Sequence, residues 1–318
     1  MILCVGEAVI DLIQTEIEGK GRAFLPVPGG CAYNTSIAIG RLGTPVSFFG
    51  RISKNFFGDT QVKRLRENNV NDALLLRCEQ NPVLAFIKTE EGKDPEYAFY
   101  EEGTSDRSLS PEELPAQLPQ DTDCIVFGSI SAVMEPIGST IESFICGEAA
   151  RSTVTAFDPN IRPFVIKDRS AYLKRFKKLT AASVIVKISL EDYKYIDAAQ
   201  QPKEALENLI DMGTRLAIIT LGPKGARAML RRSNGSVIEV SVPGIDVKHI
   251  ADTVGAGDTF HGAFLARLEQ TGKLSRNAIA ELDENDLYGA LVFANKAAAF
   301  VCGRHGAQPP YMNELEYG

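Results

Sequence analysis

Short apolar runs recur along the chain, and each of them ends at a residue that favours a turn. They are too short to form helices, but they suit strands that are buried on both faces of a sheet. The runs occupy residues 2–6, 46–50, 124–128, 154–158, 184–187 and 216–222.

Stretches with the apolar spacing of helices lie between these runs. They cover residues 32–42, 57–68, 137–151, 171–179 and 203–212. The alternation predicts βαβ units, and therefore an α/β fold whose central, mostly parallel sheet carries helices on both faces. Because ligands of such sheets bind beyond the carboxyl ends of the strands, the residues that follow each run are the first candidates for a site.

Two segments break the alternation and predict hairpins. Residues 12–17 and 22–27 flank a polar turn, and residues 83–89 and 96–100 flank a turn that contains Glu90 and Gly92. Neither hairpin has a crossover helix, so we expect both to form a small sheet beside the large one, where it would act as a lid. The predicted division is a core of residues 1–10, 32–82 and 108–318 and a lid of residues 11–31 and 83–107.

Composition narrows the choice of protein class. The net charge of −7 argues against a nucleic-acid binder, which usually carries a basic surface. Six cysteines lie far apart without a Cys-x-x-Cys pair and only three histidines are present, so we expect buried free thiols in a reducing compartment and no structural zinc. No signal peptide and no apolar run of membrane-spanning length is recognisable, which predicts a soluble cytoplasmic protein without a membrane partner.

The segment Asp-Thr-Val-Gly-Ala-Gly-Asp-Thr-Phe at residues 252–260 carries the clearest chemistry. An amphipathic helix follows it and ends at Gly272. The small residues Gly255, Ala256 and Gly257 let backbone amides converge at the start of that helix, which suits a phosphate. Asp258 would repel such an anion, so we assign it as a general base that takes a hydroxyl proton. The alternative is that Asp258 caps the helix.

This segment looks like the C-terminal signature of the ribokinase-like, or pfkB-type, carbohydrate kinases. Residues 29–34, Gly-Gly-Cys-Ala-Tyr-Asn, lead into a helix that ends at Leu42-Gly43 and resemble the N-terminal signature of the same family. The two segments occur in the family's order, and further matches lie between them. The resemblance implies a ribokinase-like fold with the ATP site in the core and the sugar site under the lid.

The resemblance also implies the residues of the sugar site. Their matching segments are the stretch after the first strand, the Gly-Gly turn, the last strand of the second lid hairpin with the loop that follows it, and an Asp-Pro-Asn-x-Arg sequence at residues 158–162. This sequence is similar to that of fructokinases and 2-keto-3-deoxygluconate kinases. A tight turn at the glycines and an ordinary Asp-Pro turn are the structural alternatives. The residues are Asp11, Gly29, Gly30, Asn34, Phe99, Arg107, Asn160 and Arg162.

The nucleotide and metal sites are implied in the same way. ATP would contact Lys187, Thr220, Gly222, Gly225, Ala294, Asn295 and Ala298, and the last three of these lie on an Ala-rich helix expected at residues 289–302. The structural alternatives are a turn between two strands for the segment with Gly222 and Gly225, and close helix packing for the residues of the Ala-rich helix. The family's Asn-x-x-Glu element is altered, with Ser189 in place of Asn, so Glu191 or Asp192 would order Mg²⁺ through water. Carbonyl groups of Asp252 and Val254 would bind a monovalent cation such as K⁺.

The expected reaction is transfer of the γ-phosphoryl of ATP to a sugar hydroxyl, with fructose as the first choice of sugar. The alternatives are 2-keto-3-deoxygluconate kinase or another sugar kinase, and a non-catalytic sugar sensor. A dinucleotide-binding oxidoreductase and a P-loop kinase lack their glycine motifs in this chain. An exposed edge of the lid favours a homodimer.

Overall fold

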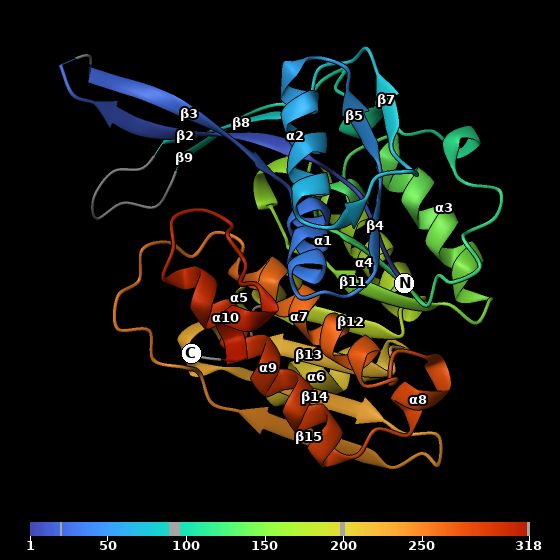
Figure 1. Ribbon diagram of the computed structural model, residues 1–318. Helices are drawn as coiled ribbons and strands as arrows, with labels where there is room; N and C mark the ends of the chain where they lie inside the picture. The colour runs from blue at the N-terminus through green and yellow to red at the C-terminus, as the bar shows by residue number, and fades with distance from the viewer. Residues whose placement is uncertain (20, 89–95, 198–200, 317–318) are drawn as a thin grey trace.

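A large sheet forms the centre of the computed structural model, which describes residues 1–19, 21–88, 96–197 and 201–316 (Figure 1). The order of its strands is β15-β14-β13-β12-β11-β10-β1-β4-β6, and all neighbours pair in parallel except β13–β14 and β14–β15. The strands are β1 (Ile2–Val5), β4 (Val46–Phe49), β6 (Val70–Asn71), β10 (Cys124–Gly128), β11 (Val154–Asp158), β12 (Ile185–Ser189), β13 (Leu216–Thr220), β14 (Ala226–Arg231) and β15 (Val237–Val242).

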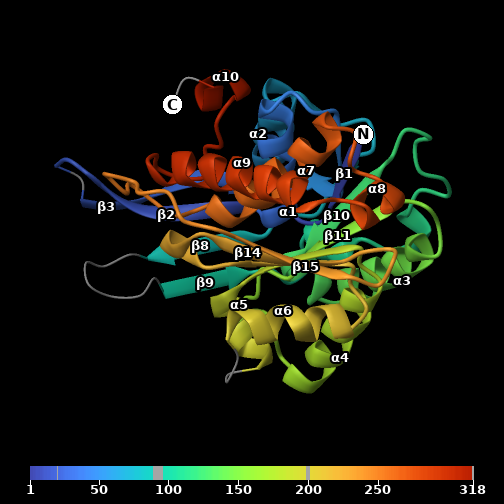
Figure 2. The same ribbon diagram turned by 90° about the horizontal axis from the view of Figure 1, so that it is seen from below.

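Helices cover both faces of this sheet, which explains why its strands are continuously apolar. In Figure 2, α1, α7 and α9 lie on one side and α3, α4 and α6 on the other. Side chains alternate between the two layers, so Ile2 and Cys4 pack into one core while Leu3 and Val5 pack into the other. The helices are α1 (Cys31–Arg41), α2 (Phe56–Glu67), α3 (Ile137–Ala149), α4 (Arg169–Ala181), α5 (Leu190–Ile196), α6 (Pro202–Asp211), α7 (Ala256–Gln270), α8 (Arg276–Ala280), α9 (Glu284–Cys302) and α10 (Met312–Glu316).

A separate sheet, which we call the lid sheet, projects from the core (Figure 1). Its order is β3-β2-β8-β9, with β2 parallel to β8 and both outer pairs antiparallel. The strands are β2 (Val9–Ile17), β3 (Gly21–Gly29), β8 (Leu84–Lys88) and β9 (Glu96–Tyr100). The predicted α/β fold with a small additional sheet is therefore confirmed. Parts of the predicted turns, Lys20 and the segment with Glu90 and Gly92, lie outside the described residues.

A buried carboxylate fixes the two places where the chain passes from core to lid sheet. Asp106 accepts hydrogen bonds from the amide of Ala8, just before β2, at 2.7 Å and from the amide of Val83, just before β8, at 3.2 Å. Burial raises the pKa of Asp106 to about 6. One side chain therefore holds both hairpins of the lid sheet against the core.

Some of the structure was not expected. A two-stranded sheet pairs β5 (Arg51–Ser53) with β7 (Leu76–Cys78). Short 3₁₀ helices occupy Asp106–Ser108, Pro111–Glu113, Ser129–Ala132, Pro163–Val165 and Gly222–Lys224. In the described part of the chain, no helix has both the length and the apolar character to cross a bilayer.

Candidate active site

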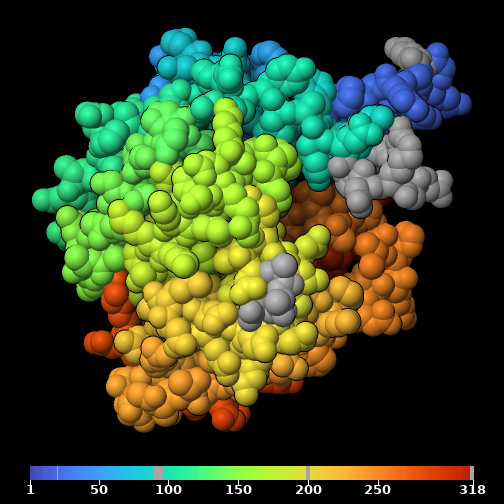
Figure 3. Space-filling model, turned by 180° about the vertical axis from the view of Figure 1, so that it is seen from behind, coloured from blue at the N-terminus to red at the C-terminus, as the bar shows by residue number. Residues whose placement is uncertain are grey.

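A cavity of about 1370 Å³ lies between the lid sheet and the carboxyl ends of the parallel strands. Figure 3 shows the molecule hollowed between the lid strands, in blue to cyan, and the orange part of the chain. The lid sheet contributes Val9, Asp11 and Phe99 to the lining, and β12 and β13 contribute Lys187 and Thr220. The cavity therefore lies beyond the carboxyl ends of the strands, where we expected ligands of such a sheet to bind.

The N-terminus of α7 forms one wall of the cavity. Gly255, the residue before the helix, has the left-handed backbone with φ of 76°, and a β-carbon there would lie 2.6 Å from that of Ala307. Only glycine fits this turn. The amides of Gly255 and Gly257 donate to no other described residue, whereas the amide of Ala256 donates to the carbonyl of Thr253 at 3.2 Å. We predicted an anion hole of three amides. In the structure the amide of Ala256 is already bonded, and the amides of Gly255 and Gly257 remain free for an anion.

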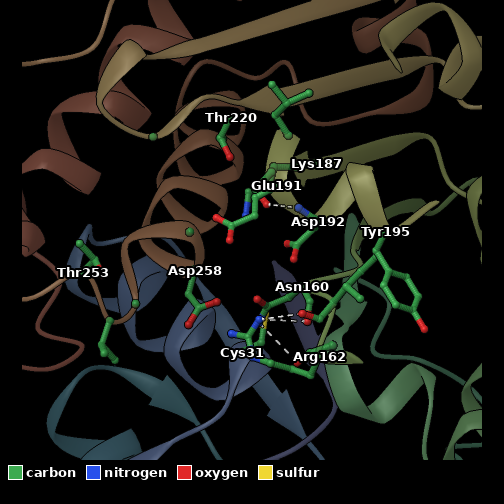
Figure 4. A pocket seen from close by; sticks show the side chains of 18 of the residues that line it. Cys31, Asn160, Arg162, Lys187, Glu191, Asp192, Tyr195, Thr220, Thr253 and Asp258 are labelled. Carbon is green, nitrogen blue, oxygen red and sulfur yellow. Dashed lines mark hydrogen bonds between the residues drawn. The ribbon is translucent and has the colours of Figure 1, made fainter. Parts of the chain in front are cut away.

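Asp258 lies in the first turn of α7 and faces the cavity (Figure 4). Asn34 donates to its Oδ2 at 2.9 Å, and the side chain does not cap the helix, because Gly255 holds the N-cap position. Burial, together with the charge of Asp158, raises the pKa of Asp258 to about 6, although the bond from Asn34 works in the opposite direction. The carboxylate is therefore ionised at neutral pH, as a base must be.

The predicted sugar end contains a second carboxylate. Burial and the charge of Asp258 raise the pKa of Asp11 to about 7, while Arg162 and Arg64 oppose the rise. A β-carbon at Gly29 would lie 2.1 Å from Asp11 Oδ2, so glycine leaves the room that this carboxylate needs. Gly30 has φ of 110° and lines the cavity beside Asn34. The structure thus brings Asp11, Gly30 and Asn34 together, with Gly29 directly behind Asp11.

The loop after β11 adds an amide and a cation to the cavity. Asn160 and Arg162 both line it, and Figure 4 shows them converging on the space in front of Asp258. Arg162 Nη1 donates to the backbone carbonyls of Asn160 at 3.5 Å and Ile161 at 3.1 Å. Among the described residues no carboxylate forms an ion pair with Arg162, so its charge is available to a ligand.

Of the two residues predicted in the second hairpin and the loop after it, only Phe99 lines the cavity. Phe99 packs against Phe164 with ring centroids 4.9 Å apart, and Tyr97 stacks on the same ring. Arg107 instead donates to the carboxylate of Glu101 and to the carbonyl of Glu135, in a different pocket of about 420 Å³. The expectation that Arg107 faces the sugar is therefore corrected, because Glu101 draws its guanidinium away.

The nucleotide residues are only partly brought together. Thr220 and Gly222 line the cavity, while Gly225 forms the turn behind them, where a β-carbon would lie 2.1 Å from the carbonyl of Val242. The remaining three residues lie on α9 and do not line the cavity: Ala294 is buried, Ala298 packs against the apolar core and Asn295 donates to the carbonyl of Pro243 at 3.0 Å. Close packing of α9 accounts for the small side chains of Ala294 and Ala298.

The candidate metal residues lie in two places, in the first turn of α5 and in the loop before α7. Glu191 and Asp192, in the first turn of α5, line the cavity without a cationic partner among the described ion pairs (Figure 4). Carboxylate oxygens of this kind fit Mg²⁺, which binds through one or two carboxylates and water. The carboxylate of Asp252 accepts from the amides of Val254 at 3.0 Å and Gly306 at 2.9 Å, so it fixes the loop in front of α7.

Sequence reasoning missed several buried polar groups around the cavity. Glu7 accepts from the amide of Cys31 at 3.0 Å and from the hydroxyl of Ser131, so it holds the start of α1. Asp158 pairs with Lys187, and His261 lies next to that pair. A carboxylate at the end of a buried strand was the available signal for Asp158.

Comparisons with known proteins agree with this geometry. The model of the pfkB family of carbohydrate kinases matches residues 1–314. A fructokinase of Rhizobium leguminosarum bv. trifolii is 37% identical over 287 residues, which are 90% of this chain and 85% of that protein. A crystal structure of a Vibrio cholerae fructokinase with fructose, ADP and calcium superposes with a TM-score of 0.83 at 25% identity, over 99% of this chain and 97% of that chain. An aminoimidazole riboside kinase of Salmonella enterica shares the fold, with a TM-score of 0.83 at 22% identity over 99% of this chain and 98% of that chain.

Proposed function

Because this chain belongs to the pfkB family of carbohydrate kinases, we propose that it transfers the γ-phosphoryl group of ATP to a hydroxyl of fructose. The observation that carries the proposal is the ionised carboxylate of Asp258 beside the free amides at the N-terminus of α7, in one cavity with Asp11. The sugar is taken from the relatives, since the Rhizobium protein is a fructokinase and the Vibrio structure holds fructose.

In the proposed mechanism the residues position the reactants and stabilise charge. Asp11, Asn34 and Asn160 bind sugar hydroxyls, and Asp258 accepts the proton of the attacking hydroxyl. The amides of Gly255 and Gly257 donate to the oxygens of the transferring phosphoryl group. Mg²⁺, held through water by Glu191 or Asp192, supplies further positive charge to the phosphates when it is bound.

The lid sheet has two proposed roles. It covers the sugar site and excludes water, which would otherwise compete as acceptor. It also pairs with the lid sheet of a second copy of this chain, because large apolar side chains at its far end are exposed: 46% of Ile17, 43% of Phe24 and 56% of Leu25. Light scattering that shows only a monomer would contradict this second role. The cytoplasm remains our proposed location, and K⁺ at the carbonyls of Asp252 and Val254 a proposed activator.

One observation favours a second substrate. The unpaired guanidinium of Arg162 suits the carboxylate of an acidic sugar, so 2-keto-3-deoxygluconate kinase is the second candidate. In that case Arg162→Gln would lose affinity for the acidic sugar. In a fructokinase the same substitution would instead lower turnover, since the cation would contact the phosphoryl group.

A coupled assay of ADP release tests the proposal with Mg-ATP and separate additions of fructose, 2-keto-3-deoxygluconate, ribose, glucose, tagatose and adenosine. We expect turnover with fructose and its loss in Asp258→Asn. Turnover with another sugar alone would overturn the choice of fructose and keep the kinase. A folded protein that binds ATP but turns over no sugar would favour a sensor.

A further inference from the structure

A buried ion pair lies directly behind the anion-binding end of α7. Lys187 Nζ is 2.8 Å from Asp158 Oδ2, and the two side chains are 5% and 2% exposed. The pairing follows from the sheet, since β11 and β12 are parallel neighbours with Phe157 opposite Val186. The next residue of each strand therefore points to the same face at the carboxyl end of the sheet.

The ammonium of Lys187 faces the helix rather than the sheet. A β-carbon at Gly257 would lie 3.1 Å from Lys187 Nζ, so the lysine occupies the space that glycine leaves free. The positive end of a helix disfavours a cation beside it. A buried ammonium at this place therefore needs a counter-charge, and Asp158 provides it.

The groups around Lys187 resemble the donors of a cation site. Cys31, Asp158 and Asp258 each offer an atom within 4.8 Å of the others, a spacing that would suit a metal ion. The same three groups act on Lys187: burial lowers its pKa, but Asp158, with smaller contributions from Cys31 and Asp258, more than offsets this and raises the pKa overall. The positive charge that such a cluster requires is thus already built into the chain.

We infer that Asp158 is a positioning residue, which holds the ammonium of Lys187 at the N-terminus of α7, where it contacts the phosphoryl group in transfer. The inference deepens the proposed function and rests on it. Lys187 and the free amides then form one electrophilic surface, with Asp258 on the hydroxyl side of the reaction. Asp158 acts only through Lys187 and touches neither substrate.

His261 leaves this charge arrangement undisturbed. Its Nδ1 lies 3.7 Å from Asp158 Oδ2, neither ring nitrogen has a hydrogen bond to a described residue, and burial lowers its pKa to about 4. The imidazole is therefore neutral, and Lys187 is the cation that neutralises Asp158. The titratable groups that act on or adjoin the pair come from four further elements: Cys31 of α1, Tyr172 of α4, Asp192 of α5, and Asp258 and His261 of α7.

A double-substitution cycle tests the inference. We expect Lys187→Met to lower kcat by about 100- to 1000-fold, as for other lost electrostatic donors. Asp158→Asn should lower kcat by about 10- to 100-fold with a much smaller change in the KM for sugar, because it displaces the lysine. In the Lys187→Met background, Asp158→Asn should change kcat by less than about twofold, since nothing remains to be positioned. Independent losses that multiply in the double variant would overturn the inference.

The pH profile gives a readout that a purely structural role would not move. Without Asp158 the buried ammonium loses its proton more easily, so the alkaline limb of kcat should move to lower pH in Asp158→Asn and be absent in Lys187→Met. An alkaline limb that stays in place in Asp158→Asn would contradict our inference. Glu142→Gln is the matched control, because this carboxylate binds Arg175 at 2.9 Å and Lys178 at 2.5 Å outside the cavity and should change neither kcat nor its profile.

Two complications can be separated from the inference. If Asp158→Asn does not fold, the comparison of Lys187→Met with the double variant, which buries neither charge, still decides whether Asp158 acts through Lys187. If no sugar is turned over, the same cycle is measured by calorimetry on ATP affinity. Coupled losses of ATP affinity would then support the inference while the proposed substrate fails, and additive losses would overturn it.

Discussion

Asp258→Asn should remove most activity and at the same time stabilise the protein. The substitution keeps the size of the side chain, and its amide oxygen can still accept the bond that Asn34 donates at 2.9 Å. It removes the base, so we expect kcat to fall by about 10²- to 10⁴-fold. It also removes a carboxylate whose charge is unfavourable inside the protein, since only 8% of the residue is exposed.

The size of the stabilisation follows from the pKa. Burial raises the pKa of Asp258 from 3.8 to about 6. The folded protein therefore binds this proton more tightly than the unfolded chain, so the contribution to stability is full below pH 4 and is lost as pH rises through 6. At pH 7 the ionised group costs about 3 kcal/mol, which the substitution recovers as a rise in Tm of roughly 4 °C.

Urea unfolding and thermal melts at pH 4, 5, 6 and 7 measure this effect, together with kcat at each pH where the protein is active. The difference in stability between the variant and the wild type should be near zero at pH 4 and grow towards pH 7. Asp211→Asn is the control, because that aspartate is 74% exposed in a surface pair with Arg231 and its loss should change stability by less than about 1 kcal/mol. A variant that is inactive but less stable at pH 7 would refute the reasoning about burial, and an active variant would refute the role as base.

Three further predictions concern the cavity and the junction between the lid sheet and the core. Gly257→Ala places a β-carbon 3.1 Å from Lys187 Nζ and should lower kcat by about tenfold with an unchanged circular dichroism spectrum; a rate like that of the wild type would show that Lys187 has no fixed place there. Because the pKa of Asp11 is about 7 and an ionised carboxylate is the better acceptor for hydroxyls, the KM for sugar should fall as pH rises from about 6 to 8. Asp11→Asn should make that profile flat, and a slope that persists would exclude Asp11 as its source. Asp106→Ala removes the acceptor of two buried amides and should cost about 2–4 kcal/mol in urea unfolding, with faster hydrogen exchange in β2 and β8 than in β1; equal protection would contradict its role at the lid sheet.

The fold was largely predictable from the sequence, because strands that are covered on both faces give continuous apolar runs. The exact ends of the helices were less predictable. The last long helix was predicted from residue 289 but begins at Glu284, since its first turn is polar and is held by Asp283, which accepts from the amide of Asp286 at 2.8 Å. Local capping of this kind carries no apolar periodicity, so a reading based on spacing does not detect it.

The site was predictable where one segment supplies it and not where segments must meet. Asp258 and the glycines before it lie in one motif, and their positions agree with the expectation except for the amide of Ala256. The pair of Asp158 and Lys187 depends on β11 lying next to β12, which is a property of the strand order. The prediction that Arg107 faces the sugar was wrong for the same reason, because its pairing with Glu101 can be recognised only in three dimensions.

The ionised carboxylates that the reaction needs lower the stability of the protein. Turnover and stability should therefore change with pH in opposite directions. Asp11 and Asp258 in the cavity and Asp106 at the base of the lid sheet have pKa values raised to about 6 or 7; Asp106 and Asp258 are buried and Asp11 is half-buried. Each of them stabilises the folded state when protonated and loses that contribution as pH rises, whereas Asp258 must be ionised to act as a base and Asp11 to accept from a hydroxyl. Between pH 5 and 7 the stability contributed by these groups should therefore fall while turnover rises. The fold tolerates them because large apolar cores on both faces of the sheet hold the surrounding strands, so the cost of the site is borne by packing that takes no part in the reaction.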